Sequence, residues 1–327
     1  RSFGLFVGSL DGEVLRLFAQ RLGGFARPRG GLGTTHVEGL GAVLAERWLV
    51  LVGGERALGA DGSERDPAEP ALYDLLTWGG ATSTVLPRRP TALVARGSAL
   101  LLLADGGGTW VDFASGDTTS VDPPSGLAPA PPPDAVLRIG PDGTFATARL
   151  SRARLGAAVT WVEGVGLVVA GGADDGAGIE VLGRGEAAAR PLPYPSDPTT
   201  GAAAVALGES ALMLLGGADP GGGARSVRTI ALTCTADCVA AEAADLGVAT
   251  RRARGFVVGG GVLGVVEAED TRAFLVALDG STATEMPLRQ PRRGAVVVPA
   301  PNGTLALLGG VTPDGSPAAT VELWFPE

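Results

Sequence analysis

Four short apolar runs in this sequence end in a Gly-Gly pair, and this recurring pattern constrains the fold most. The runs are WLVLVGG at Trp48–Gly54, LVVAGG at Leu167–Gly172, ALMLLGG at Ala211–Gly217 and TLALLGG at Thr304–Gly310. An apolar run of this length that ends at glycine is typical of a buried strand. A pattern repeated at intervals of about 20–50 residues indicates an array of small, similar units.

The glycines of these pairs are predicted to be structural, because glycine tolerates the positive φ that a sharp turn requires. They are Gly53, Gly54, Gly171, Gly172, Gly216, Gly217, Gly309 and Gly310.

One unit is clearest between Arg152 and Leu182. Leu155–Val162 and Val165–Ala170 read as two strands joined by a Glu-Gly turn, and Ile179–Leu182 follows an Asp- and Gly-rich loop as a third strand. Similar groups of strand-like runs recur along most of the chain. The expected units cover 36–86, 91–121, 155–182, 201–246, 254–288 and 293–325.

These units predict an all-β chain, folded as one domain over residues 1–327. The expected architecture is a β-propeller of six four-stranded antiparallel blades. Seven blades are the alternative, because a hairpin at 3–20 or at 135–150 would form a degenerate blade. The Pro-rich stretch 123–134 is expected to be a loop excursion, since proline cannot join a central strand.

The last unit ends one strand short, whereas the N-terminal region has a hairpin to spare. We therefore expect residues 318–325 to pair with a strand from residues 3–20 and to close the ring of blades. Closure of this kind removes free sheet edges, which otherwise invite aggregation.

Three short motifs resemble the kelch repeat. They are Arg-x-Arg-x-Gly-Ala-Ala-Val at 152–159, Leu-Val-Val-Ala-Gly-Gly at 167–172 and Ile-Glu-Val-Leu at 179–182; Val-Glu-Leu-Trp at 321–324 repeats the last. The resemblance is to bacterial kelch propellers, of the type that forms the central domain of galactose oxidase. It implies an Arg before the inner strand, a Gly-Gly after the second strand and a Glu in the third. The glycines of the second and fifth units depart from this pattern, and for this reason the resemblance does not decide between six and seven blades.

The chemical inventory is poor for an enzyme. His36 is the one histidine and the chain has two tyrosines, so the copper ligands of the related oxidases are missing. His36 is expected to be structural. Asp105–Trp110 resembles the Asp-box turn of sialidase-like propellers, but a single copy is weak. We expect no cofactor and no metal, and keep a glycan-active, sialidase- or lyase-like enzyme as the alternative function.

Charge and cysteine content indicate which partners and which cellular compartment to expect. The net charge of −9 disfavours nucleic-acid binding. The chain has no lysine, so its 26 Lys and Arg positions are all arginine, a bias that suggests a GC-rich bacterial genome. No apolar stretch reaches the length of a spanning helix. Cys234 and Cys238 are spaced to form a disulfide across a hairpin loop, with two reduced thiols as the alternative. A disulfide favours an exported protein, either periplasmic, outer-membrane-associated or extracellular.

Arginines precede the inner strand of five units. In a four-stranded blade these segments emerge on the same face as the loops after Gly-Gly, which are acidic. Arg89, Arg154, Arg252 and Arg293 are therefore candidate binding residues for carboxylate or phosphate groups on a partner. The alternative is that these arginines only form structural ion pairs between blades. The expected function is that of a non-catalytic binding or scaffolding propeller that engages a protein, or else a saccharide, through one loop face.

Overall fold

The computed structural model describes residues 3–10, 14–21, 23–28, 30–81, 86, 89–104, 107–113, 117–121, 134–139 and 145–326. The described chain is all-β, and its one helical element is the 3₁₀ turn Pro301–Gly303. Within these ranges no helix is long and apolar enough to cross a membrane.

Six sheets each contain four antiparallel strands. The first three are β5 (Leu40–Leu44), β6 (Trp48–Val52), β9 (Ala71–Asp74) and β10 (Gly79–Ala81); β11 (Ala92–Arg96), β12 (Ala99–Ala104), β13 (Gly107–Asp112) and β14 (Thr118–Val121); and β17 (Ala158–Val162), β18 (Gly166–Ala170), β19 (Ile179–Leu182) and β20 (Arg190–Pro191). The others are β21 (Ala203–Leu207), β22 (Ala211–Leu215), β23 (Arg228–Ala231) and β24 (Ala241–Glu242); β25 (Arg252–Val258), β26 (Gly261–Glu267), β27 (Thr271–Val276) and β28 (Ala283–Met286); and β29 (Val296–Pro299), β30 (Leu305–Leu308), β31 (Glu322–Phe325) and β3 (Gly24–Ala26).

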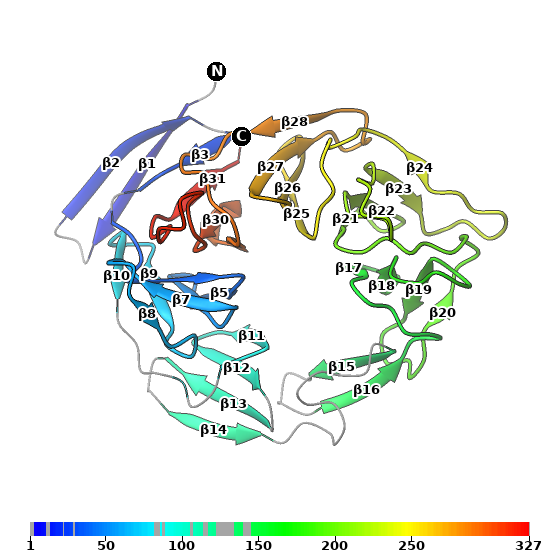
Figure 1. Ribbon diagram of the computed structural model, residues 1–327, viewed down its shortest axis with the longest axis horizontal. Coiled ribbons are helices and arrows are strands. Elements are labelled where there is room, and N and C mark those ends of the chain that lie inside the picture. The colour runs from blue at the N-terminus through cyan, green and yellow to red at the C-terminus, as the bar shows by residue number, and fades with distance from the viewer. Residues whose placement is uncertain are drawn as a thin grey trace.

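The core lies in layers between neighbouring sheets, which Figure 1 shows arranged around a common centre. Buried side chains of β17–β20 pack against β21–β24, those of β21–β24 against β25–β28, and those of β25–β28 against β29–β31. Further layers join β29–β31 to the sheet of β5, and that sheet to β11–β14. The central strands of the sheets that lie between two neighbours are apolar on both faces because a layer covers each face.

All eight glycines of the Gly-Gly pairs have positive φ, as the sequence predicts. For the first glycine in three of the four pairs, a second constraint is the close approach of neighbouring backbone. A Cβ atom on Gly171 would lie 2.6 Å from the carbonyl oxygen of Thr199, and one on Gly309 would lie 2.8 Å from that of His36. One on Gly53 would lie 2.9 Å from the carbonyl oxygen of Pro90. These pairs therefore allow the turn and also allow backbone segments to touch.

Gly216 differs from the other three first glycines in what it faces. A Cβ atom there would meet a side chain, at 3.0 Å from Cγ2 and 3.1 Å from Oγ1 of Thr250. The same Oγ1 accepts the backbone N–H of Gly217 at 2.6 Å. Gly216 is structural, as predicted, but its φ of 63° is the main reason for glycine at this position, and contact between backbones is not.

The C-terminal strand does pair with an N-terminal strand, but not with the expected one. β31 pairs with β3, at Gly24–Ala26, which lies outside the predicted range 3–20. β1 (Phe3–Leu10) and β2 (Val14–Arg21) form a hairpin of their own. Removal of residues 1–22 would therefore leave the pairing of β3 with β31 in place.

The first expected unit contains more strands than four. Its charged segment 55–70 contributes β7 (Arg56–Gly59) and β8 (Glu64–Arg65), which form a three-stranded sheet with β4 (Thr34–Val37). Near the end of this unit the structure has β10 at Gly79–Ala81, and 82–85 lie outside the described residues. β15 (Ala135–Ile139) and β16 (Phe145–Arg149) form the predicted hairpin, whereas 123–133 of the Pro-rich stretch lie outside the described residues.

The disulfide is confirmed. Cys234 and Cys238 are bonded, with their Cα atoms 5.9 Å apart, in the loop between β23 and β24. Cys238 is buried in the layer shared with β17–β20, so the bridge fixes that loop against the neighbouring sheet.

The pairing of β3 with β31 has a testable anchor in Phe25. Its buried ring meets that of Trp324 edge to face, with centroids 5.3 Å apart. We expect Phe25→Ala to lower the free energy of unfolding by about 3–5 kcal/mol, because it leaves a cavity beside Trp324. Chemical denaturation measures this. The control Leu278→Ala removes a side chain that is half exposed and should change stability by less than about 1 kcal/mol. Equal losses in the two variants would contradict the anchoring role.

Candidate functional site

Arg154 is buried against strands of its own sheet, so it is not available to bind another molecule. Its side chain and that of Glu180 are both 0% exposed, and Nε and Nη2 both lie 2.8 Å from Oε1 of Glu180. Nη1 donates to the carbonyls of Gly171 at 2.8 Å and Gly178 at 3.1 Å. The other carboxylate oxygen, Oε2, accepts the backbone N–H of Ser151 at 2.6 Å. This candidate binding residue therefore ties together the segment before β17, the Gly-Gly turn and β19.

Arg292 repeats the arrangement in another sheet. Its Nη2 lies 2.9 Å from Oε1 of Glu322, and both side chains are 0% exposed. Nη1 donates to the carbonyls of Gly309 and Thr320 at 3.3 and 2.8 Å. Oε2 of Glu322 accepts the backbone N–H of Arg289 at 2.7 Å. The same residue types thus hold the same three segments.

We call a buried side chain that binds the carbonyl of the first glycine of a Gly-Gly pair a bracing side chain. A fixed spacing in the sequence identifies its position. Arg154 and Arg292 bind the carbonyl of the first glycine 17 residues further on, and His36 lies 17 residues before Gly53 with its Nδ1 2.8 Å from that carbonyl. A carbonyl only accepts, so Nδ1 of His36 carries the proton. His36 is fully buried and is structural, as predicted.

The sheet β21–β24 has the charges reversed. Arg228 lies in β23, the strand that corresponds to β19, and its Nη1 is 2.5 Å from Asp197 in the segment before β21. Burial alone would raise the pKa of Asp197, but Arg228 and the hydroxyl of Thr199 outweigh it, so this pKa is lowered. The Arg–Glu pairs and this Arg–Asp pair each connect segments of a single sheet. The structural alternative expected ion pairs between adjacent blades, and these pairs do not join adjacent sheets.

The other candidate arginines lie in different surroundings. Arg89 and Arg293 are exposed, whereas Arg252 is half-buried on β25. Arg252 pairs in register with Glu267, whose carboxylate accepts the backbone N–H of Gly294 at 2.7 Å. Burial raises the pKa of Glu267, although its hydrogen bonds and the nearby arginines act in the opposite direction. Of the four candidates, only Arg293 lines the cavity described next.

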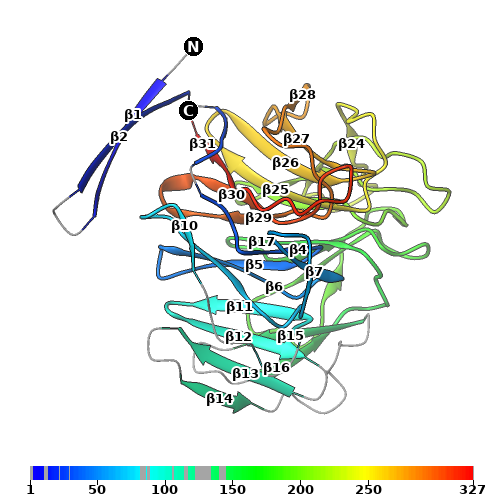
Figure 2. The ribbon, with the colours of Figure 1, turned by 60° about the vertical axis from the view of Figure 1, so that its left-hand side comes forward.

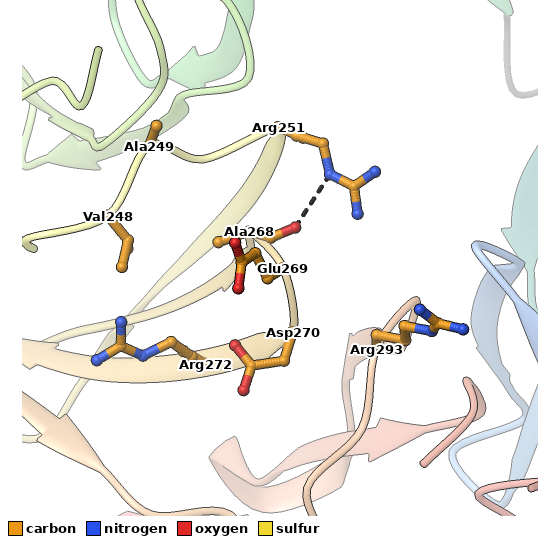
Figure 3. A pocket seen from close by; sticks show the side chains of 8 residues that line it. All are labelled: Val248, Ala249, Arg251, Ala268, Glu269, Asp270, Arg272 and Arg293. Atoms are coloured by element: carbon orange, nitrogen blue, oxygen red, sulfur yellow. Dashed lines mark hydrogen bonds between the residues drawn. The ribbon is translucent and has the colours of Figure 1, made fainter. Parts of the chain in front are cut away.

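This cavity of about 680 Å³ opens beside the segment that precedes β25 and the turn between β26 and β27 (Figure 3). Its lining residues are Val248, Ala249, Arg251, Ala268, Glu269, Asp270, Arg272 and Arg293. Arg251 and Arg293 extend to one side of the view, whereas Arg272 extends to the opposite side. Arg272 is paired with Glu285, and its Nε donates to Oε1 at 2.8 Å.

The turn carries two of the acidic residues that the sequence placed on this face, Glu269 and Asp270. Nε of Arg251 donates to the carbonyl of Ala268 at 3.0 Å, which leaves its two Nη groups directed away from the turn. Arg251 is not among the four candidates that the sequence suggested. Its place directly before β25 is the signal that would have identified it.

The lining is charged, and its carboxylates are those of Glu269 and Asp270. It contains no serine, cysteine, histidine or tyrosine. Within the described part of the chain, no three His, Cys, Asp or Glu side chains come together as a metal site would require. No protein-family model matches the sequence, and a search of curated proteins finds no significant match.

The bracing role of Arg154 leads to a stability prediction. Arg154→Gln leaves the carboxylate of Glu180 buried without its cation, which typically costs about 3–5 kcal/mol. The matched control is Arg152→Gln in the same segment. Arg152 pairs at 2.7 Å with Asp175, whose side chain is 84% exposed, and such a pair contributes about 0–1 kcal/mol. Urea unfolding should separate the two variants clearly. Similar small losses in both would show that Arg154 does not brace the turn.

His36 leads to a prediction about pH. Burial lowers the pKa of His36 below 6.5, although the hydrogen bond to the carbonyl of Gly53 acts in the opposite direction. The unfolded chain then binds a proton more readily than the folded chain. This contribution to stability is complete above pH 6.5 and is lost as the pH falls below it, by at most about 1.4 kcal/mol per pH unit.

Comparison with His36→Gln isolates this effect, because the chain has one histidine. Unfolding by urea at about pH 7.5 and about pH 5.5 should show a smaller loss in the variant than in the parent. An identical loss in both proteins would mean that His36 does not set this part of the pH dependence.

Proposed function

We propose that the six four-stranded sheets and the hairpin β15–β16 are seven successive blades of a β-propeller, of which one is incomplete. Figure 1 places β5, β11, β17, β21 and β25 on the inner side of the array. β5 contacts both β29 and β11, and β21 contacts both β17 and β25. The pairing of β3 with β31 would close the ring, as terminal strands do in propellers.

The two bracing sets support a kelch-type propeller. The resemblance rests on an Arg before the inner strand, a Gly-Gly after the second strand and a Glu in the third. Arg154, Gly171 and Glu180 have hydrogen bonds that give each of these positions a physical role, and Arg292, Gly309 and Glu322 repeat them.

The role that this geometry supports best is that of an exported binding module without catalysis. The observation that carries it is the pair Arg251 and Arg293. Both are exposed, line one cavity and extend to the same side, and neither belongs to an ion pair formed among the described residues. The disulfide is compatible with an oxidising compartment.

Such a pair of guanidinium groups fits a partner that carries carboxylates. A guanidinium offers parallel donors in a fork that matches a carboxylate, and hydrogen bonds to charged groups are about twice as strong as neutral ones. Glu269 and Asp270 beside the arginines would repel a uniformly anionic surface. A protein segment with a few acidic side chains among neutral or basic ones fits this mixture better than a polyanion does.

A binding screen tests the proposal. Acidic peptides and uronic-acid oligosaccharides are immobilised, and binding of the parent is measured at low and high salt. We expect salt-sensitive binding to acidic peptides. The double variant Arg251→Gln/Arg293→Gln should bind about 100-fold more weakly, since each charged hydrogen bond contributes about 1.5–3 kcal/mol.

The control variant Arg56→Gln/Arg190→Gln has the same change in charge at two exposed arginines away from the cavity and should bind like the parent. Equal binding by the two double variants would overturn the proposed site. Binding to oligosaccharides alone would replace the protein partner by a saccharide.

A further inference from the structure

The position between β11–β14 and β17–β20 holds two strands where its neighbours hold four. β15 pairs with β16 and with no other strand of the described residues. Arg149 at the end of β16 forms a backbone bridge with Ala188, and Nη2 of Arg138 donates to the carbonyl of Gly183 at 3.1 Å. Both contacts join the hairpin to the segment that leads into β20. The edge of β15 away from β16 therefore has no strand partner in the described chain.

Strand β17 has two partly exposed apolar side chains on the side that looks toward this position, and the guanidinium of Arg184 lies over one of them, Trp161, at 5.6 Å from the ring centroid. Ala158 and Val162 pack into the layer shared with β21–β24. Successive side chains of a strand point to opposite faces, so Val159 and Trp161 lie on the other face. They are 52% and 44% exposed. A Trp and a Val on a sheet face normally lie under a neighbouring sheet.

The sheet on the other side of the position has the same property. Leu93 of β11 packs into the layer shared with β5 and β6, and Val94 next to it lies on the opposite face and is 40% exposed. Apolar layers join five neighbouring pairs of sheets, but no layer formed by described residues joins β11–β14 to β17–β20. The cross-strand neighbours of Val94 and Val159 on the same faces, Leu101 and Val169, are buried. Exposed apolar side chains of β11 and β17 and one open strand edge therefore meet here.

The same chain has a hairpin without a sheet. β1 and β2 pair with each other over eight residues and with no other strand of the described chain. Their sequences, FGLFVGSL and VLRLFAQR, are mostly apolar. Isolated two-stranded hairpins are marginally stable in water. The hairpin projects away from the sheets near β3, on the side of the molecule opposite β15, so it does not reach the incomplete sheet of its own chain (Figures 1 and 2).

We propose that the hairpin β1–β2 of one copy docks into the incomplete sheet of a second copy. It would pair with the open edge of β15 and cover Val94, Val159 and Trp161. A hairpin supplies two strands, the number by which β15–β16 falls short of its neighbours. The strand of the hairpin that pairs with β15 already has its other edge hydrogen-bonded to the second strand of the hairpin. Docking therefore leaves neither edge of that strand unpaired. A single extended peptide would leave the sheet one strand short.

The geometry of this contact determines the kind of assembly. Donor and acceptor are different surfaces of the same chain, so the contact is head-to-tail. Head-to-tail contacts form closed rings or open chains, and a two-fold dimer with one shared interface is not expected. Each added copy leaves one hairpin and one incomplete sheet available for the next.

Two variants separate donor from acceptor. Trp161→Asp places a charge on the acceptor face and keeps the hairpin. Phe6→Pro/Phe18→Pro removes two N–H donors at a cross-strand pair of the hairpin and keeps the acceptor. We expect the parent to assemble with rising concentration in sedimentation velocity, and each variant alone to remain monomeric. A mixture of the two should give a 1:1 heterodimer and nothing larger, because the competent hairpin of one meets the competent sheet of the other.

Controls keep the result interpretable. Leu278→Asp changes another exposed apolar residue, in the turn after β27, and should assemble like the parent. Val159→Glu is a second acceptor variant in case Trp161→Asp unfolds, which circular dichroism detects. A monomeric parent at all concentrations, assembly by the hairpin variant alone, or a mixture without heterodimer would each overturn the proposal. A monomer whose Trp161 is shielded from a soluble quencher would show that the same chain covers the face.

Discussion

The conformation of the loops beside the Gly-Gly turns depends on one interaction. It is the hydrogen bond from a buried side chain to the carbonyl of the first glycine. Arg154, Arg292 and His36 do this in three different sheets, at the same distance along the chain. Burying a guanidinium is costly unless its hydrogen bonds and its counter-ion are in place. Here the carboxylates of Glu180 and Glu322 serve as counter-ions and also bind backbone N–H groups of the incoming segment. One network therefore fixes a strand, a turn and a loop together.

Bracing from within leaves neighbouring positions available for contact with a partner. Arg292 is fully buried, whereas Arg293 beside it is exposed at the cavity. The loops that present Arg251 and Arg293 need little reordering on binding if the buried side chains already hold them, and pre-ordered loops lower the entropic cost of association. Stability and recognition thus belong to different members of the same arginine clusters.

Much of the fold could be predicted because Gly-Gly turns and short apolar runs are local signals, and most strands follow from them. The disulfide follows from the spacing of the two cysteines. The strand Gly24–Ala26 could not be predicted, since three residues carry little periodicity and its partner strand lies about 300 residues further along the chain. Arg154 was assigned to the binding face because adjacent arginines look alike in sequence. The separation of 17 residues from the Gly-Gly turn, together with a Glu in the third strand, distinguishes the buried one. The structure was needed to single out Arg251, Val159 and Trp161. Their exposure depends on how the sheets are arranged, and the local sequence does not give that.

A double-mutant cycle on Arg292 and Glu322 tests the bracing account most directly. The variants Arg292→Met and Glu322→Gln are compared, singly and together, by chemical denaturation. If the two side chains form one buried network, each single variant is strongly destabilised, the double variant is scarcely worse, and the coupling energy is about 2–3 kcal/mol. Losses that add to within about 0.5 kcal/mol would show that the pair acts independently, and would contradict the account.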